Sequence, residues 1–156
     1  MATFNGYAVT AKLPEFPLSN NITAASTATI AAPAGTTSLT AVMQGIGGSI
    51  TPTSYNNALI AVSGQMVNAT VADGATVDIR YGTGTAPVNG AAVTGTLVGI
   101  AQTSGSITAG QKSGFSVVAV VNGLIPGTTY WVDASLMAVT GGTASISGIT
   151  VTTVEL

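Results

Sequence analysis

The amino-acid sequence predicts an all-β protein, an antiparallel jelly roll or β-sandwich with an extended N-terminal arm. Thr, Ser, Ala and Val dominate the 156 residues, and β-branched side chains favour strands. The 20 Gly residues interrupt the chain often, while the strong helix formers Glu, Lys, Arg and Gln are scarce. Short strand-like runs alternate with turn signals along the chain, which is typical of sandwiches and jelly rolls.

The first 20 residues are predicted to form an arm that is separate from a single jelly-roll domain over residues 21–156. Pro14 and Pro17 lie too close together for a helix or a central strand. A frayed terminus is the alternative interpretation, although disordered tails are usually poor in aromatic residues. We expect the arm to anchor on a neighbouring protein through five apolar side chains: Phe4, Tyr7, Leu13, Phe16 and Leu18.

Four strands are expected in the first half of the chain. Residues 22–32 and 38–44 are rich in Thr, Ala and Val and end at turns that contain Gly or Pro. Residues 58–71 form a longer run that Gly64 interrupts, and a Gly inside a strand often marks a bulge or a close backbone contact. Residues 77–81 alternate between apolar and charged side chains, which indicates a half-buried strand.

The second half is predicted to contain two polar loops, over residues 82–95 and 103–113, on either side of a short strand at 96–101. Pro126 followed by Gly127 fits a type II turn, because that turn favours Pro at its second position and Gly at its third. The remaining strands are expected over residues 115–121, 128–139, 144–146 and 149–156, with a break between the last two at Gly148.

Residues 115–121 are apolar on both faces, so we expect the core to cover one face and a neighbouring subunit to cover the other. Asp133 lies close to Trp131 on a strand of mostly apolar residues, and a buried carboxylate without a partner is costly. We therefore expect Asp133 to pair with Arg80 or Lys112 at a subunit contact. The predicted subunit interface consists of seven residues: Phe115, Val117, Val118, Val120, Tyr130, Trp131 and Asp133.

The chain has three Lys or Arg residues and five Asp or Glu residues, so that 5% of it is charged, against about a quarter in an ordinary soluble domain. It has neither His nor Cys, which removes the usual base of a serine or cysteine hydrolase and the usual ligands of zinc. Asp73, Asp78 and Asp133 are the candidates for a glycosidase pair, but the first fits a turn and the second fits an ion pair with Arg80. No Asp-x-Asp pattern indicates calcium. We expect no enzymatic activity, no metal and no cofactor.

Three dispersed basic residues cannot form a phosphate-binding stripe, so nucleic acid is not an expected partner. No apolar run approaches the roughly 20 residues that cross a bilayer, and the N-terminus does not read as a secretory signal. A surface so poor in charge is expected instead to contact other protein.

Several segments carry a resemblance to a known group of proteins. They are residues 43–47, 49–53, 77–92, 123–133, 140–146 and 154–156, within a match that covers roughly residues 40–156. In these segments the chain resembles small virion structural proteins of tailed bacteriophages, of the capsid decoration or head-spike type. The resemblance implies a trimeric jelly roll of the tumour-necrosis-factor or C1q type, in which each subunit packs a flat apolar sheet face around a threefold axis. The arm lies outside the match.

The leading hypothesis is a capsid decoration protein, a homotrimer on the outer surface of a phage head, made in the cytoplasm of a bacterial host. The arm would bind the major capsid protein. The alternative is a receptor-binding module of a tail or fibre that engages host-surface glycan through loops at residues 82–95 and 103–114, beside Tyr130 and Trp131. Copy number per particle separates the two hypotheses.

Overall fold

The structure is a computed structural model that describes residues 25–105 and 108–156, so the five predicted anchoring residues of the arm lie outside the described residues. The described residues contain β-strands and no helix, which confirms the all-β prediction. The strands are β1 (Ala25–Ile30), β2 (Val42–Met43), β3 (Gly48–Ile50), β4 (Asn57–Asn68), β5 (Gly74–Thr83), β6 (Thr96–Gly105), β7 (Lys112–Asn122), β8 (Tyr130–Ala138) and β9 (Ala144–Glu155).

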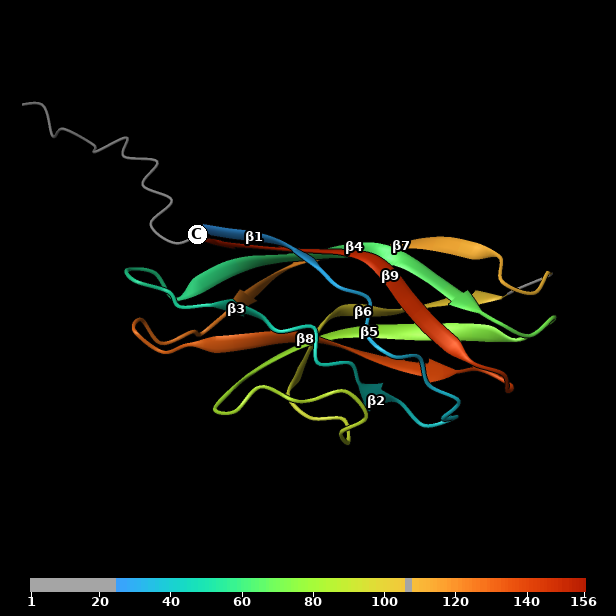
Figure 1. Ribbon diagram of the computed structural model, residues 1–156. Coiled ribbons are helices and arrows are strands. Elements are labelled where there is room, and N and C mark those ends of the chain that lie inside the picture. The colour runs from blue at the N-terminus through green and yellow to red at the C-terminus, as the bar shows by residue number, and fades with distance from the viewer. Residues whose placement is uncertain (1–24, 106–107) are drawn as a thin grey trace, which may run out of the picture.

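The strands form two antiparallel sheets that pack face to face as a sandwich (Figure 1). One sheet has the order β1-β9-β4-β7, and the other has the order β2-β8-β5-β6 with β3 also paired to β8. Apart from the β5–β6 hairpin and the β2–β3 pair, each connection carries the chain from one sheet to the other. This order is that of a jelly roll, so the predicted fold class is confirmed.

The core lies between the sheets and follows from the period-two alternation of each strand. In β4 the buried apolar side chains are Ala58, Ile60, Val62 and Met66, while the residues between them are half-buried or exposed. Strand β8 is the exception, because Tyr130 to Leu136 are buried on both faces. The core covers one face of β8, and another segment of the chain must cover its outer face.

Two local predictions are confirmed. The register of β4 against β9 shifts between Ser63 and Gln65, and a Cβ at Gly64 would lie 2.8 Å from the Phe115 ring, so Gly64 is both a bulge and a close contact. The N–H of Thr128 donates to the carbonyl of Ile125 over 3.1 Å, and Gly127 has φ +81°, as a type II turn requires.

Other boundaries differ from the sequence prediction. Strand β9 runs through Gly148 without a break, because β4 pairs with it on both sides of the bulge. Strands β6 and β7 extend into the predicted loop at residues 103–113. Of the predicted strand at residues 38–44, the two residues of β2 remain, and β3 was not predicted. The strand predicted at residues 38–44 ends early because the buried carboxylate of Asp133 binds the backbone N–H groups of Gly45 and Ile46.

Candidate assembly surfaces

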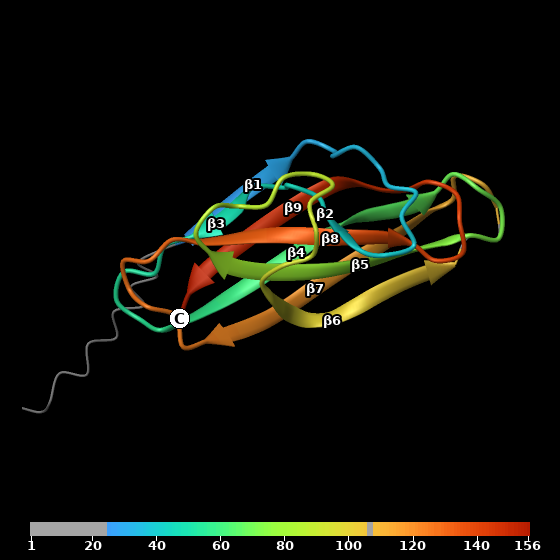
Figure 2. The ribbon, with the colours of Figure 1, turned by 90° about the horizontal axis from the view of Figure 1, so that it is seen from below.

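The outer face of the sheet formed by β2, β8, β5 and β6 is covered over β8 and β2 by the chain's own β5–β6 loop, while β6 stays largely exposed. Figure 2 shows this loop, residues 84–95, crossing over β8 and β2. The N–H of Met43 donates to the carbonyl of Ala91 over 2.9 Å, and the N–H of Gly90 donates to the carbonyl of Met43 over 2.8 Å. The loop therefore pairs with the edge of β2 and covers this part of the face.

Trp131 is the anchor of this covering loop. Its indole Nε1 donates to the carbonyl of Thr83 over 3.1 Å, and its side chain is 5% exposed. The ring lies against Gly82 and Gly95, the two glycines that flank the loop, and a Cβ at Gly82 would lie 2.5 Å from ring atom Cζ2. Glycine is needed at both positions because the indole ring fills the space that a side chain would take.

The Asp133 side chain is 1% exposed, and it stabilises the irregular segment between β2 and β3. Its carboxylate accepts hydrogen bonds from the backbone N–H groups of Gly45 (3.0 Å), Ile46 (2.9 Å) and Ala134 (2.7 Å). Burial raises the pKa of the Asp133 carboxyl above its ordinary value, while these three N–H groups act to lower it. The carboxylate thus holds residues 44–47 as a bulge, and this bulge splits the strand that was predicted to be continuous.

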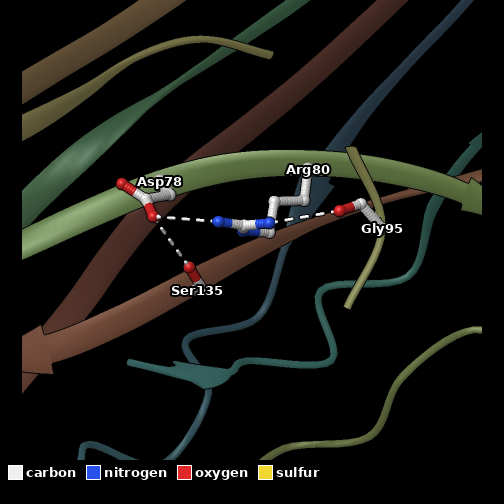
Figure 3. Close-up of polar contacts among 4 residues, drawn as sticks. All are labelled: Asp78, Arg80, Gly95 and Ser135. Carbon is white, nitrogen blue, oxygen red and sulfur yellow. Dashed lines mark hydrogen bonds and ion pairs between the residues drawn. The ribbon is translucent and has the colours of Figure 1, made fainter. Parts of the chain in front are cut away.

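Within the chain, the Asp133 carboxylate is held by these backbone N–H groups, and its expected pairing with Arg80 or Lys112 at a subunit contact stays a prediction. Arg80 lies directly opposite Asp133 on β5, but its guanidinium turns to Asp78 at 3.6 Å and donates to the carbonyl of Gly95 over 3.1 Å (Figure 3). Ser135 also reaches Asp78, at 3.5 Å. The predicted Asp78–Arg80 pair is confirmed, and it helps to tie the loop's return at Gly95 to the sheet.

The outer face of the other sheet has no such cover in the described part of the chain. We call this surface the open face and define it by six residues at its centre: Leu59, Ala61, Val118, Val120, Thr152 and Val154. Leu59 lies level with Val120 on one side and Val154 on the other, and the next outward row joins Val118, Ala61 and Thr152. Val118 is 60% exposed and Val120 is 49% exposed. The centre of the open face is consequently largely apolar, with five of its six side chains being Val, Ala or Thr.

Formal charge is nearly absent from this sheet. Its two charged residues within the described residues are Lys112, at the start of β7, and Glu155, at the end of β9. The Glu155 carboxylate is buried and accepts hydrogen bonds from the N–H of Thr53 (3.0 Å) and from the Thr53 hydroxyl (2.9 Å), as well as from Ser54 and Tyr55. Glu155 thus secures the β3–β4 loop and leaves the open face uncharged.

The seven residues predicted for a subunit interface fall into two groups. Val118 and Val120 lie on the open face. The other five are at most 7% exposed and are covered by their own chain: Phe115, Val117, Tyr130, Trp131 and Asp133. Tyr130, for example, accepts a hydrogen bond from the N–H of Ile125 over 2.9 Å and lies beside Tyr81. These five side chains have little surface left for a neighbour.

The same geometry bears on the other sites considered from the sequence. Tyr130 and Trp131 are buried, so neither ring is presented for stacking on a sugar. Residues 82–95 are docked along the sheet, and residues 103–114 are divided between β6, β7 and their connection. Among the described residues, no group of three or more His, Cys, Asp or Glu side chains could hold a metal ion, and no helix is long and apolar enough to cross a membrane.

Sequence reasoning missed the open face as a unit, because its rows come from strands that are far apart in the chain. Leu59, Ala61, Thr152 and Val154 alternate with buried neighbours, so each strand alone looks half-buried. The available signal was the absence of charge at every outward position of β4 and β9.

Comparison with known proteins adds little to this description. No family model matches the chain, and no curated protein matches it. Among solved structures, the chain is similar to one described as the structure of infectious bursal disease virus Gx strain, with 16% sequence identity and a TM-score of 0.49. That match covers 84% of this chain and 33% of the other, so the chain spans about a third of that protein's length. The jelly-roll assignment rests on the strand order itself.

Proposed function

We propose that the chain is a virion structural protein that assembles with copies of itself and coats the outer surface of a tailed-phage head. In this proposal it is a homotrimer, and the arm at residues 1–20 binds the major capsid protein. The segments that resemble phage decoration proteins include both the Asp133 strand and the covering loop, at residues 123–133 and 77–92. In this proposal the protein binds other coat proteins and catalyses no reaction.

The observation that carries the proposal is the asymmetry between the two sheet faces. One outer face is covered over β8 and β2 by the chain's own loop, whereas the open face presents Val118, Val120, Leu59 and Val154 with no charge among them. Exposed apolar patches of this kind mark interaction sites. Since a low-charge protein has little protection against association, a defined assembly that covers this face is a favourable state.

A contact that buries about 1,000 Å² of apolar surface would be sufficient for stable association. Each Å² of apolar surface removed from water contributes roughly 25 cal/mol, so a buried area of about 1,000 Å² contributes roughly 25 kcal/mol before the costs of association. Those costs are about 4–15 kcal/mol or more. A sheet face of short side chains also loses little side-chain entropy on packing, because Val, Thr and Ala have few rotamers.

The carboxylates support a role without catalysis. Asp133 and Glu155 hold backbone N–H groups of loops, and Asp78 pairs with Arg80. Each has a structural task that accounts for its position. A glycan-cleaving pair would need two carboxyl groups that face a common substrate site, with one poised as an acid.

The test uses the virus that encodes the chain. Quantitative gels of purified particles should contain hundreds of copies of the protein per particle, and removal of residues 1–18 should leave a folded oligomer that no longer binds particles. A few copies per particle, together with binding of the isolated protein to host cells, would support the receptor-binding alternative. Retained binding after the deletion would place the anchor elsewhere.

A further inference from the structure

Among the described residues, the sheet that bears the open face ends in two edge strands with no further strand beside them, β1 and β7, and their geometry is complementary. In the order β1-β9-β4-β7, each neighbouring pair is antiparallel, so β1 and β7 run in opposite directions. The outer edge of a sheet carries unpaired N–H and C=O groups, which form a template for another strand. Two edges of opposite direction on one sheet can therefore pair with each other between copies of the chain.

Gln102 identifies which groups of β7 point to its open edge. Its side-chain amide, reaching from β6, donates to the carbonyl of Ser116 over 2.5 Å and accepts from the N–H of Ser116 over 3.2 Å. In an antiparallel strand the N–H and C=O of one residue point to the same side, and this side alternates along the strand. Val118 and Val120 share the orientation of Ser116, and no hydrogen bond on the edge side is described for either residue.

The same alternation fixes the outward groups of β1. Ser116 lies level with Ser63, Thr150 and Thr29 across the sheet, and Val118 lies level with Ala61, Thr152 and Thr27. Ser116 faces away from β4, so its row is non-hydrogen-bonded between β7 and β4, hydrogen-bonded between β4 and β9, and non-hydrogen-bonded between β9 and β1. Thr27 and Thr29 consequently point their N–H and C=O groups away from β9, to the open edge.

We propose that β1 of one copy adds antiparallel to β7 of a second copy, with Thr27 opposite Val118 and Thr29 opposite Ser116. This inference rests on the proposed self-assembly and adds a backbone contact at the sheet edge, which is separate from the contact through the open face. Residues 25–29 of β1 lie at the same levels as residues 116–120 of β7, so these rows continue from copy to copy without a shift in register. Each pairing is hydrogen-bonded, and the side chains of Thr27 and Val118 fall on the same face.

A second copy suits this edge better than an unrelated strand. Thr27 and Thr29 are exposed and uncharged, as are Ser116, Val118 and Val120, so nothing in the two edges repels. The contact joins two different edges, so it is heterologous and gives a closed ring when the rotation between copies closes. Pairing at Ser116 displaces the Gln102 amide, whose two hydrogen bonds the incoming Thr29 backbone replaces.

The experiment compares Val118→Pro with Val118→Thr in the full chain. Proline removes the edge N–H and is tolerated where that N–H faces outward, whereas threonine keeps the N–H and the branched shape. Native mass spectrometry gives the oligomer, and hydrogen exchange gives the protection of the Val118 and Val120 amides. We expect protected amides and an oligomer in the wild type and in Val118→Thr, with a loss of association on the order of 100-fold in Val118→Pro. Thr27→Pro, on the opposite edge, should cause the same loss, and it serves as the test if Val118→Pro does not fold.

Three results would overturn the edge pairing. The first is an oligomer that survives both proline variants, which would leave self-assembly through the open face standing. The second is an oligomer that Val118→Thr abolishes as fully as proline does, which would place the contact in side chains. The third is a wild-type chain that stays monomeric with the Val120 amide unprotected; the virion assignment would then still be decided by copy number on particles.

Discussion

Asp133 decides the local course of two strands through three backbone hydrogen bonds. Its carboxylate gathers the N–H groups of Gly45 and Ile46, so that four residues, 44–47, stand opposite two residues of β8. The bulge has a sequence signature in the glycines, since Gly45 and Gly47 both have positive φ. The carboxylate that holds it lies 88 residues away from Gly45, and no local pattern links the two.

Replacement of Asp133 by Asn tests this role through the pH dependence of stability. Asn can still accept from Ile46 and Ala134 but opposes the Gly45 N–H with an NH₂ group, so we expect a loss of about 1–2 kcal/mol near neutral pH. Since the folded pKa of Asp133 is raised, the folded wild type binds a proton more readily than the unfolded chain. The contribution of this group to stability therefore increases as the pH falls from the folded pKa toward 3.8.

The Asn variant lacks this gain, so the gap in unfolding free energy between the two proteins should widen on acidification. Urea unfolding near pH 7 and at about pH 4 measures the gap. A gap that narrows at the lower pH would mean that the carboxylate is stabilised by its partners more than it is penalised by burial.

Gly95 tests the packing of Trp131 under the covering loop. It has φ +77°, and a Cβ there would overlap the Trp131 ring and lie 2.6 Å from the Tyr81 carbonyl oxygen. We expect Gly95→Ala to lower the unfolding free energy by about 2–4 kcal/mol, because both the backbone and the ring must shift. The matched control is Gly84→Ala, with φ +81° and open space around it, which should cost about 1 kcal/mol. Equal losses in the two variants, measured by thermal unfolding, would show that the ring contact adds nothing.

At the scale of elements, the sequence predicted the strands whose signals are local. The alternation in β5, the Gly64 bulge and the turn at Pro126 all depend on neighbouring residues, and all three are confirmed. The errors occur where pairing with a strand that is distant in the sequence sets the ends of an element. Pairing with β4 carries β9 through Gly148, and pairing with β5 extends β6 into residues that look like a loop. The interface was predicted in part on buried residues, because an apolar residue beneath the chain's own loop cannot be told from one beneath a neighbour.

The Gln102 side chain makes a prediction about the edge element β7. It occupies the edge groups of Ser116, so a neighbouring strand must displace two hydrogen bonds there, each of about 1 kcal/mol net. We expect Gln102→Ala to strengthen association by a few fold to tenfold while lowering the stability of the isolated subunit slightly. Analytical ultracentrifugation over a dilution series measures the first effect, and urea unfolding at low concentration measures the second. Weakened association in this variant would mean that Gln102 orders the edge for binding instead of competing with it.

In the folded molecule, the few charged side chains lie away from the centre of the open face. The charged side chains Asp78, Arg80, Asp133 and Glu155 are engaged in ion pairs or in hydrogen bonds to loops, and Glu155 and Asp133 are buried. Little charge then remains to keep copies apart, and none lies at the centre of the open face. In the proposed assembly, this uncharged centre is the surface at which we expect copies to associate.

Assembly through the open face links thermal stability to protein concentration. If copies bind one another in the folded state alone, the wild-type Tm should rise with concentration.

Thr152→Glu places a charge at the centre of this face at small cost to the subunit, since Thr152 is half-buried and polar. A carboxylate buried in an apolar contact without a partner is penalised by several kcal/mol, so the variant should associate more weakly, and its Tm should depend less on concentration. The matched control is Thr96→Glu, at an exposed position of β6 in the other sheet, which adds the same charge to the same residue type and should keep the concentration dependence. A weaker dependence in both variants would attribute the effect to net charge, and an undiminished dependence in Thr152→Glu would exclude the open face from the contact.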